Sequence, residues 1–317
     1  MRMTPNRTCP GRAVRRGRRG AALLWLLVLL CGLGAAQEAS AQCASGRTVG
    51  NNFVASGSYD PFSATDVFDA FTIQVRNNSP VACSYGLVFH RNTLPATMGG
   101  AVTYAVTNAS GTSVMSTTGQ NAIAPVWLPV MNVPAGATVT MTYYVAIARG
   151  QVVGPATRQD SINIWMYGLD PVGNLVLPRL HSDNVTVRYT TPTSISTNVA
   201  GGGQATTVDF GELTAGAVRS VTLEARSNVN YQLRATSLNL GVMRLPAPFD
   251  SWSIPYAATL SGSALALGTV SGTVLGPSTP TPAAGRAHPL AVTIGSVSGK
   301  RAGTYTDEIT ISIEVAP

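Results

Sequence analysis

The chain has few residues of the kinds from which most catalytic and metal sites are built. Only 11% of its 317 residues are Asp, Glu, Lys or Arg, and it has three histidines. These are His90, His181 and His288, which are spread along the chain with no second histidine or cysteine two to four positions away. Because zinc ligands recur at such short spacings, a zinc site is not indicated. We interpret each histidine as a surface or loop residue.

The sequence also lacks the motifs of nucleophilic catalysis and of phosphate binding. No Gly-x-Ser-x-Gly motif lies in a strand-turn-helix context, and the glycines at 201–203 precede a Thr/Val run rather than a helix. Asp60, Asp66 and Asp69 cluster, but their spacing fits no EF-hand loop, so we favour turn chemistry over calcium binding. We predict that the protein is not an enzyme and uses no cofactor or metal.

A long apolar run occurs only near the N-terminus. Arg-rich residues 1–20 precede an apolar stretch at 21–36, and Ala39 and Ala41 occupy small-residue cleavage positions. This order is typical of a secretory signal peptide, which we assign to residues 1–41. A membrane anchor is the alternative, but the stretch is shorter than the roughly 20 residues of a spanning helix.

Removal of the signal peptide changes the charge of the protein. Seven of the 21 basic residues and one of the 14 acidic residues lie within residues 1–41. The remaining 14 basic and 13 acidic residues give a net charge near +1. The overall basic character therefore belongs to the signal peptide, and no nucleic-acid partner is expected.

Two of the four cysteines, Cys43 and Cys83, remain after cleavage. Disulfides form and persist in exported proteins, so we predict that these two residues are bonded. Closing a loop of about 40 residues contributes ~4 kcal/mol in the chain-entropy model. Two unrelated buried thiols are the alternative.

The sequence repeats itself at an interval that indicates two tandem domains. Residues 71–78, FTIQVRNN, match residues 221–228, VTLEARSN, and the phrase around Asp160 returns around Asp307. A Thr/Ser- and Gly-rich stretch at 191–204 separates the copies. We place an N-terminal domain at 42–192 and a C-terminal domain at 193–317.

Apolar residues alternate with polar ones through both copies, which predicts half-buried strands. Ile162, Ile164 and Met166 follow Asp160, and a run of the same period follows Asp307. The Thr206–Phe210 run is also strand-like, and no segment after residue 41 has a helical period with caps. Each domain therefore reads as an antiparallel β-sandwich. Asn184–Thr190 can form one more strand after the first copy, whereas Ala316 and Pro317 alone follow the second. We expect the C-terminal domain to lack its last strand.

Four motifs together resemble those of the spore coat protein U domain family. They are YDPFSAT at 59–65, VDFGEL at 208–213 followed by RSVTLEARSN, IPYAATLSG at 254–262, and the closing AGTYTDEITISIEV. Members of that family include subunits of archaic chaperone-usher pili of Gram-negative bacteria. The likeness covers nearly all of the mature chain and is strongest in its C-terminal half.

The resemblance implies an immunoglobulin-like, pilin-like fold whose incomplete domain accepts a donor strand. In that family the strand comes from the adjacent subunit or, before assembly, from a periplasmic chaperone, and an outer-membrane usher is a further partner. The protein would pass through the periplasm to the cell surface. The residues expected to line the donor-strand groove are Val221, Leu223, Ile309, Ile311, Ile313 and Val315.

The resemblance further implies a tip adhesin, because Cys43 follows the cleavage site so closely that no free donor segment remains. Its N-terminal domain would mediate attachment to a host or abiotic surface and biofilm formation. The apolar loop residues that we select as adhesive candidates are Leu94, Met98, Val126, Trp127, Leu128, Leu175 and Leu177. A minor structural pilus subunit or coat-like assembly protein is the first alternative, and a secreted carbohydrate-binding or hydrolytic sandwich protein is the second.

Overall fold

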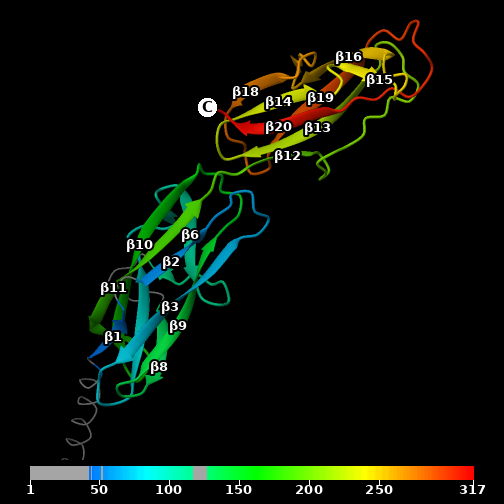
Figure 1. Cartoon of the computed structure of the whole chain (residues 1–317). Coiled ribbons are helices and arrows are strands. Elements are labelled where there is room, and N and C mark those ends of the chain that lie inside the picture. Colours follow the sequence, from blue (N-terminus) through cyan, green and yellow to red (C-terminus); the bar gives the residue numbers. More distant parts are fainter. Residues whose placement is uncertain (1–42, 44, 51–52, 117–126) are drawn as a thin grey trace, which may run out of the picture.

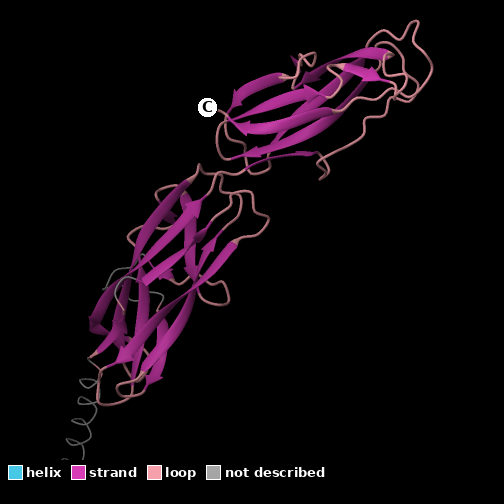
Figure 2. Cartoon of the chain, viewed as in Figure 1, coloured by secondary structure: helices cyan, strands magenta, loops and turns pink. Residues whose placement is uncertain are grey.

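The computed structural model describes residues 43–317 except 44, 51–52 and 117–126. All the regular elements of this described part are strands, β1 to β20, arranged as two sandwiches in tandem (Figures 1 and 2). The predicted all-β class is therefore confirmed. No helix in the described ranges is long and apolar enough to cross a membrane.

The N-terminal domain consists of two facing sheets, in which β3 shows the alternation that the sequence predicts. Phe71, Ile73 and Val75 on β3 point into the core and are buried, while the residues between them are exposed. The strands of the first sheet, in spatial order, are β1 (Gly46–Val49), β3 (Val67–Asn77), β9 (Thr138–Ile147), β6 (Val102–Thr107) and β5 (Ala96–Met98).

The second sheet of this domain is centred on β10. The strands, in spatial order, are β2 (Phe53–Ser58), β11 (Leu175–Thr191), β10 (Ala156–Leu169), β4 (Cys83–His90) and β7 (Met115–Ser116), and β8 (Leu128–Val133) pairs with β4. β10 is antiparallel to both β4 and β11, and β11 is parallel to β2. Both long edges of β10 are therefore satisfied.

The C-terminal domain repeats this plan with a smaller second sheet. Its first sheet contains, in order, β12 (Ile195–Val199), β13 (Val218–Ser227), β19 (Arg286–Ile294), β16 (Ser253–Leu260) and β15 (Val242–Arg244), and β17 (Ser263–Ala264) pairs with β16. Its second sheet contains only β18 (Thr273–Ser278), β14 (Tyr231–Ser237) and β20 (Ile309–Val315). β20 is an edge strand whose one described partner is β14.

The chain passes from one sandwich to the other between Thr191, where β11 ends, and Ile195, where β12 begins. The buried Asn228 holds this short connection. Its Nδ2 donates to the carbonyl oxygens of Pro192 at 2.8 Å and Val153 at 3.3 Å, and its Oδ1 accepts from the Ser194 amide at 2.9 Å. One side chain thus binds the connection and a loop of the N-terminal domain.

Two of the three histidines contradict our surface interpretation. His288 is buried between the hydroxyls of Tyr231 and Ser261, each 2.9 Å from a ring nitrogen. Burial, with a smaller effect from Arg286, lowers the pKa of His288. His90 is also buried and stacks on Trp165 with 3.9 Å between ring centroids. His288 takes an inward position of β19 ahead of the apolar ones. His90 lies on the opposite face of β4 from Leu87 and Phe89 and is covered there by Trp165.

Candidate functional site

Two features of this fold are candidates for function, and the first is the free edge of β20. Ile309, Ile311 and Ile313 pack against the C-terminal core but are only half-buried, and Val315 is half-exposed. When Asp160 is aligned with Asp307, their counterparts on β10 are Ile162, Ile164 and Met166. All three have 0% exposure. Strands with the same pattern thus differ in burial.

The difference arises from β11, which covers the equivalent edge in the N-terminal domain. Val185, Val187 and Tyr189 on β11 point into the core and are buried. In the antiparallel register Ile162 lies opposite Val185, and Asp160 lies opposite Val187. No described strand takes this place in the C-terminal domain. Its second sheet therefore has an unpaired edge and a partly uncovered core.

The missing strand also explains why Thr206–Phe210, predicted as strand-like, is not a strand. In the N-terminal domain the segment after β1 crosses to the second sheet and becomes β2 by pairing with β11. The segment after β12 finds no such partner among the described strands. A shallow hollow at this segment is lined by Thr206, Thr207, Val208, Asp209, Arg219, Ser220 and Val221.

The predicted groove residues are mostly brought together. Val221, Ile309, Ile311 and Ile313 are half-buried around one apolar cluster to which the buried Leu223 belongs. Val315 lies at the end of β20 and is not part of that cluster. A surface that a further strand could cover is therefore lined by Val221, Leu223, Ile309, Ile311 and Ile313.

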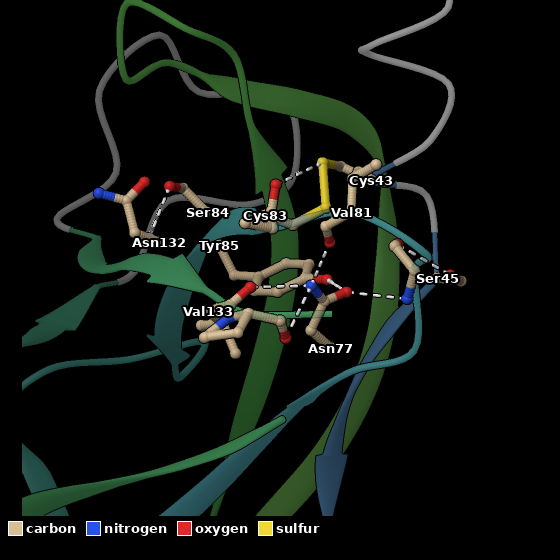
Figure 3. The surroundings of a disulfide bond; sticks show 12 residues. Cys43, Ser45, Asn77, Val81, Cys83, Ser84, Tyr85, Asn132 and Val133 are labelled. Atoms are coloured by element: carbon tan, nitrogen blue, oxygen red, sulfur yellow. Dashed lines mark hydrogen bonds between the residues drawn. A yellow bond between two sulfur atoms is a disulfide. The ribbon is translucent and has the colours of Figure 1, made fainter. Parts of the chain in front are cut away.

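The second feature is the end of the N-terminal domain opposite Thr191, which we call the far end. The predicted disulfide is confirmed there: Cys43 and Cys83 are bonded, with 5.6 Å between their Cα atoms (Figure 3). Because Cys83 begins β4, the bond fixes the first described residue of the chain to the central part of the second sheet.

A buried asparagine, Asn77, organises the loops of the far end (Figure 3). Its Nδ2 donates to the carbonyl oxygens of Val81 at 2.7 Å and Val133 at 2.9 Å. Its Oδ1 accepts from the Ser79 amide at 2.8 Å and from the Tyr85 hydroxyl at 2.7 Å. One side chain thus joins the loops after β3 and β8 to β4, and the far end is rigidly built.

Exposed apolar side chains gather at this far end. Met131 on β8 is 58% exposed, Val172 in the β10–β11 turn is 81% exposed, and Leu177 on β11 is 56% exposed. The turn is held by Asp170, whose Oδ1 accepts from the amides of Val172 at 3.0 Å and Asn174 at 2.7 Å. Hydrogen bonds from Asn174 and then Val172 lower the pKa of Asp170. Val172 is therefore presented on an ordered turn.

The adhesive candidates near the far end have unequal exposure. Leu177 is exposed, whereas Leu175 and Trp127 are partly buried against a small cluster on the outer face of the second sheet. The buried members of this cluster are Val88, Trp165 and Tyr167. Leu128 packs partly buried against the main core. Val126 lies outside the described residues.

The remaining two candidates, Leu94 and Met98, lie elsewhere. Leu94 is exposed in the segment that leads from β4 to β5, away from the far end. Met98 is fully buried, because β5 pairs with β6 and directs this side chain inward. We therefore withdraw Met98 from the contact surface. Two further side chains are exposed instead: Val172, which lies within the candidate stretch 170–177 but was not selected, and Met131 on β8, which sequence reasoning missed.

The acidic cluster has structural roles. Asp60 accepts from the Phe62 amide at 3.0 Å, Asp66 accepts from the Arg149 amide at 3.0 Å, and Asp69 accepts from the Tyr189 hydroxyl at 2.8 Å. Within the described ranges no three His, Cys, Asp or Glu side chains group as metal ligands. Turn and strand contacts thus account for these carboxylates.

Comparisons with known proteins give matches only among solved structures, since no family model and no curated protein matches the chain. One match is a chain from the CsuC–CsuE chaperone–tip adhesion subunit complex of archaic chaperone-usher Csu pili of Acinetobacter baumannii. It has 12% identity, a TM-score of 0.47, and coverage of 84% of this chain and 99% of that chain. The membership of the spore coat protein U domain family stays a prediction.

Two further matches come from CFA/I fimbriae. A chain of a chaperone–tip adhesin complex has 14% identity, a TM-score of 0.37, and coverage of 84% of this chain and 96% of that chain. The adhesin CfaE of enterotoxigenic Escherichia coli, in a mutant form, has 13% identity, a TM-score of 0.35, and coverage of 84% and 92%. The structural neighbours are thus pilus tip adhesins and their chaperone complexes, at a similarity that carries no functional weight by itself.

Proposed function

We propose that the protein is the tip adhesin of an archaic chaperone-usher pilus. Its C-terminal domain accepts a donor strand, and its N-terminal domain mediates attachment and biofilm formation. The observation that carries the proposal is the contrast between the covered strand β10 and the uncovered strand β20. The export signal expected at residues 1–41 fits passage through the periplasm to the cell surface.

The physical basis is the cost of leaving β20 uncovered. Its outward amides and carbonyls have no described strand partner, and three isoleucine side chains remain partly in water. Each exposed apolar side chain of a donor strand that becomes fully buried in the groove contributes about 1.5–3 kcal/mol. Three or four such side chains together approach the roughly 5–15 kcal/mol net stability of a domain. A strand supplied by another protein would therefore have a large effect.

The N-terminal domain supplies the model for this strand. β11 runs antiparallel to β10 and parallel to β2, and it inserts apolar side chains at alternate positions. A donor strand with the same direction would pair with β20 on one side and with the Thr206–Phe210 segment on the other. The periplasmic chaperone would supply such a strand first, the adjacent pilin subunit would replace it, and the outer-membrane usher would mediate the exchange.

The N-terminal domain contains its own covering strand, so its far end is free for a different task. Exposed apolar side chains on ordered loops usually mark an interaction site. Val172 is exposed on an ordered turn, and Met131 and Leu177 are exposed on strands β8 and β11 at the same end of the domain. The far end therefore provides the contact surface for a host or abiotic surface.

The donor-strand proposal is tested by grafting. A copy of residues 170–191, which contains the turn and β11, is appended after Ala316 of the mature protein. The matched control carries Ser at the copies of Val185, Val187 and Tyr189. The first graft should give a monomer with a raised melting temperature of the C-terminal domain, and the control should not. Equal melting of both grafts and the parent protein would refute strand acceptance.

The adhesion proposal is tested with Val172→Ser and Leu177→Ser together, on cells that display the fibre. Attachment to polystyrene should fall while the amount of fibre stays constant. Val54→Ser is the matched control, because Val54 is 56% exposed, as Leu177 is, but lies on β2 away from the far end. Normal attachment by the double variant would instead support the minor structural subunit.

A further inference from the structure

We infer that the end of the C-terminal domain opposite the interdomain connection is a docking surface for the folded body of the subunit that donates the strand. This rests on the proposed function and extends it from the strand to a second contact. We call this docking surface the exit end. The exposed apolar residues of this end that we consider are Leu238, Leu240, Phe249 and Trp252.

The direction of the donor strand follows from the two copies of the fold. β20 starts with Ile309 beside Ser237 and ends with Val315 beside Tyr231. The end with Val315 lies next to the interdomain connection, because the Ala316 amide donates to the Asn230 oxygen at 3.0 Å and Asn228 binds the connection. A strand antiparallel to β20, as β11 is to β10, therefore enters near the connection and leaves at the opposite end (Figure 1).

The register of β11 locates the point of exit. Thr191, the last residue of β11, lies opposite Ala156, four residues before Asp160. The position four residues before Asp307 is Gly303. A donor strand in the same register makes its last pairing beside Gly303, and the body that follows it must lie beyond this residue.

Exposed apolar side chains surround that point. Leu238 and Leu240 lie in the turn between β14 and β15, and Phe249 and Trp252 lie in the loop between β15 and β16. Leu238 is the most exposed, at 74%. Contiguous exposed side chains of this size mark an interaction site more often than an ordinary protein surface.

The exit end is ordered around the same residues. The Asn239 side chain and the Arg244 amide both donate to the Thr306 oxygen, at 3.1 Å and 2.9 Å. The guanidinium of Arg301 lies 3.8 Å from the centroid of the Phe249 ring. The two loops are therefore attached to the segment 301–306 along which the donor strand would leave.

Leu240 adds backbone evidence for a constrained surface. Its φ angle is +57°, a conformation that is uncommon for residues other than glycine and is strained for them. The Gly241 amide donates to the Ser237 hydroxyl at 2.7 Å, and that hydroxyl donates to Asp307 at 2.6 Å. The turn thus holds an apolar side chain outward at the start of β20.

The occupant is the donating subunit because its body is tethered at this place. A body joined to the donor strand by a few residues has a high effective concentration at the exit end, so a small apolar contact is sufficient for docking. In the assembled fibre the pilin subunit has replaced the chaperone, and an usher, which supplies no strand, is not held beside Gly303.

The test uses photo-crosslinking in the full-length protein, in cells that assemble the fibre. Leu238→p-benzoylphenylalanine and Trp252→p-benzoylphenylalanine probe the exit end, and Ile311→p-benzoylphenylalanine probes the groove. Val274→p-benzoylphenylalanine is the matched control, because Val274 is also exposed but lies on β18. Crosslinked partners are identified by mass spectrometry of purified fibres.

The expected result is that both exit-end probes crosslink to the same pilus subunit as the groove probe, while the control does not. A groove crosslink to a subunit without exit-end crosslinks would overturn this inference and leave strand acceptance intact. Exit-end crosslinks only to usher or chaperone would also overturn it. A groove probe that meets no subunit would contradict the proposed function itself.

A second measurement asks whether the contact matters energetically. Leu238→Ser and Trp252→Ser together should raise the rate at which the protein is lost from purified fibres about tenfold, since small apolar contacts of this kind change dissociation rates most. Val274→Ser should leave the rate unchanged. An unchanged rate for the double variant would mean that the exit end is not a docking surface.

Discussion

The two sandwiches of this protein can be compared directly, because they share a strand pattern and differ in whether a further strand covers its edge. Apolar residues alternate after Asp160 on β10 and after Asp307, which lies just before β20, and each strand pairs with an equivalent neighbour, β4 or β14. Only β10 is covered by a strand of the same chain among the described residues. Burial of an alternating strand is therefore decided by its neighbours and not by its own sequence.

The comparison extends to the connections at the ends of the sandwiches. Asn77 ends β3, whereas Asn228 directly follows the matched strand β13, one position later in the alignment, and each asparagine binds backbone groups of adjacent loops. Asn77 builds the free far end, whereas Asn228 binds the interdomain connection. Hydrogen bonds from a buried asparagine thus organise the free far end in one domain and the interdomain connection in the other.

The largest expected effect comes from paired truncations of the matched isoleucines. Ile164→Ala should destabilise the N-terminal domain by about 3 kcal/mol, because a fully buried side chain leaves a cavity. Ile311→Ala should cost about 1 kcal/mol, because this side chain is already partly in water. Denaturant titration read by hydrogen exchange reports each domain separately. Equal losses in the two domains would remove the distinction between a covered and an uncovered strand.

A smaller effect is expected at the far end. Asn77→Ala should cost about 2 kcal/mol, because buried carbonyls of the adjoining loops lose their donor. Asn78→Ala, an exposed neighbour, should change stability by less than about 0.5 kcal/mol. The two variants are compared by chemical denaturation of the N-terminal domain. A similar loss in both would show that Asn77 does not hold the loops together.

The smallest expected effect concerns pH and the C-terminal domain. Burial lowers the pKa of His288 in the folded state, so the unfolded chain takes up the proton first as the pH falls. The contribution of the neutral side chain is full above the unfolded pKa of about 6.5 and is lost below it. Melting at pH 7.5 and 5.5 should show a loss that His288→Gln reduces. An identical pH dependence in the variant would assign the loss to other groups.

The elements that follow a period of two were predictable from the sequence, because alternation records which side chains face the core. This holds for Ile162 and Ile164, and for the outline of β20. The disulfide was predictable because the predicted cleavage after residue 41 would leave only Cys43 and Cys83. The irregular structure of Thr206–Phe210 was not predictable. Pairing of this segment depends on a strand that the described chain does not supply.

The sites were less predictable than the fold. Met98 and the exposed Val172 both stand in turn-rich apolar stretches, so the sequence does not distinguish them. Met98 is buried because β5 pairs with β6, whereas Val172 is exposed because the β10–β11 turn projects from the domain. Trp165 and Tyr167 pack on the outer face of the second sheet, which breaks the expected alternation of inside and outside. The unbroken apolar run at 164–167 was the available signal for a strand buried on both faces.

The most direct test of the central claim is amide hydrogen exchange of β20 in the monomeric mature protein, compared with β10 and with the protein that carries the β11 graft. The amides of β20 that do not pair with β14 should exchange far faster than those of β10, and the active graft should protect them while the Ser control graft does not. Protection of these amides in the ungrafted monomer, equal to that of β10, would contradict the account.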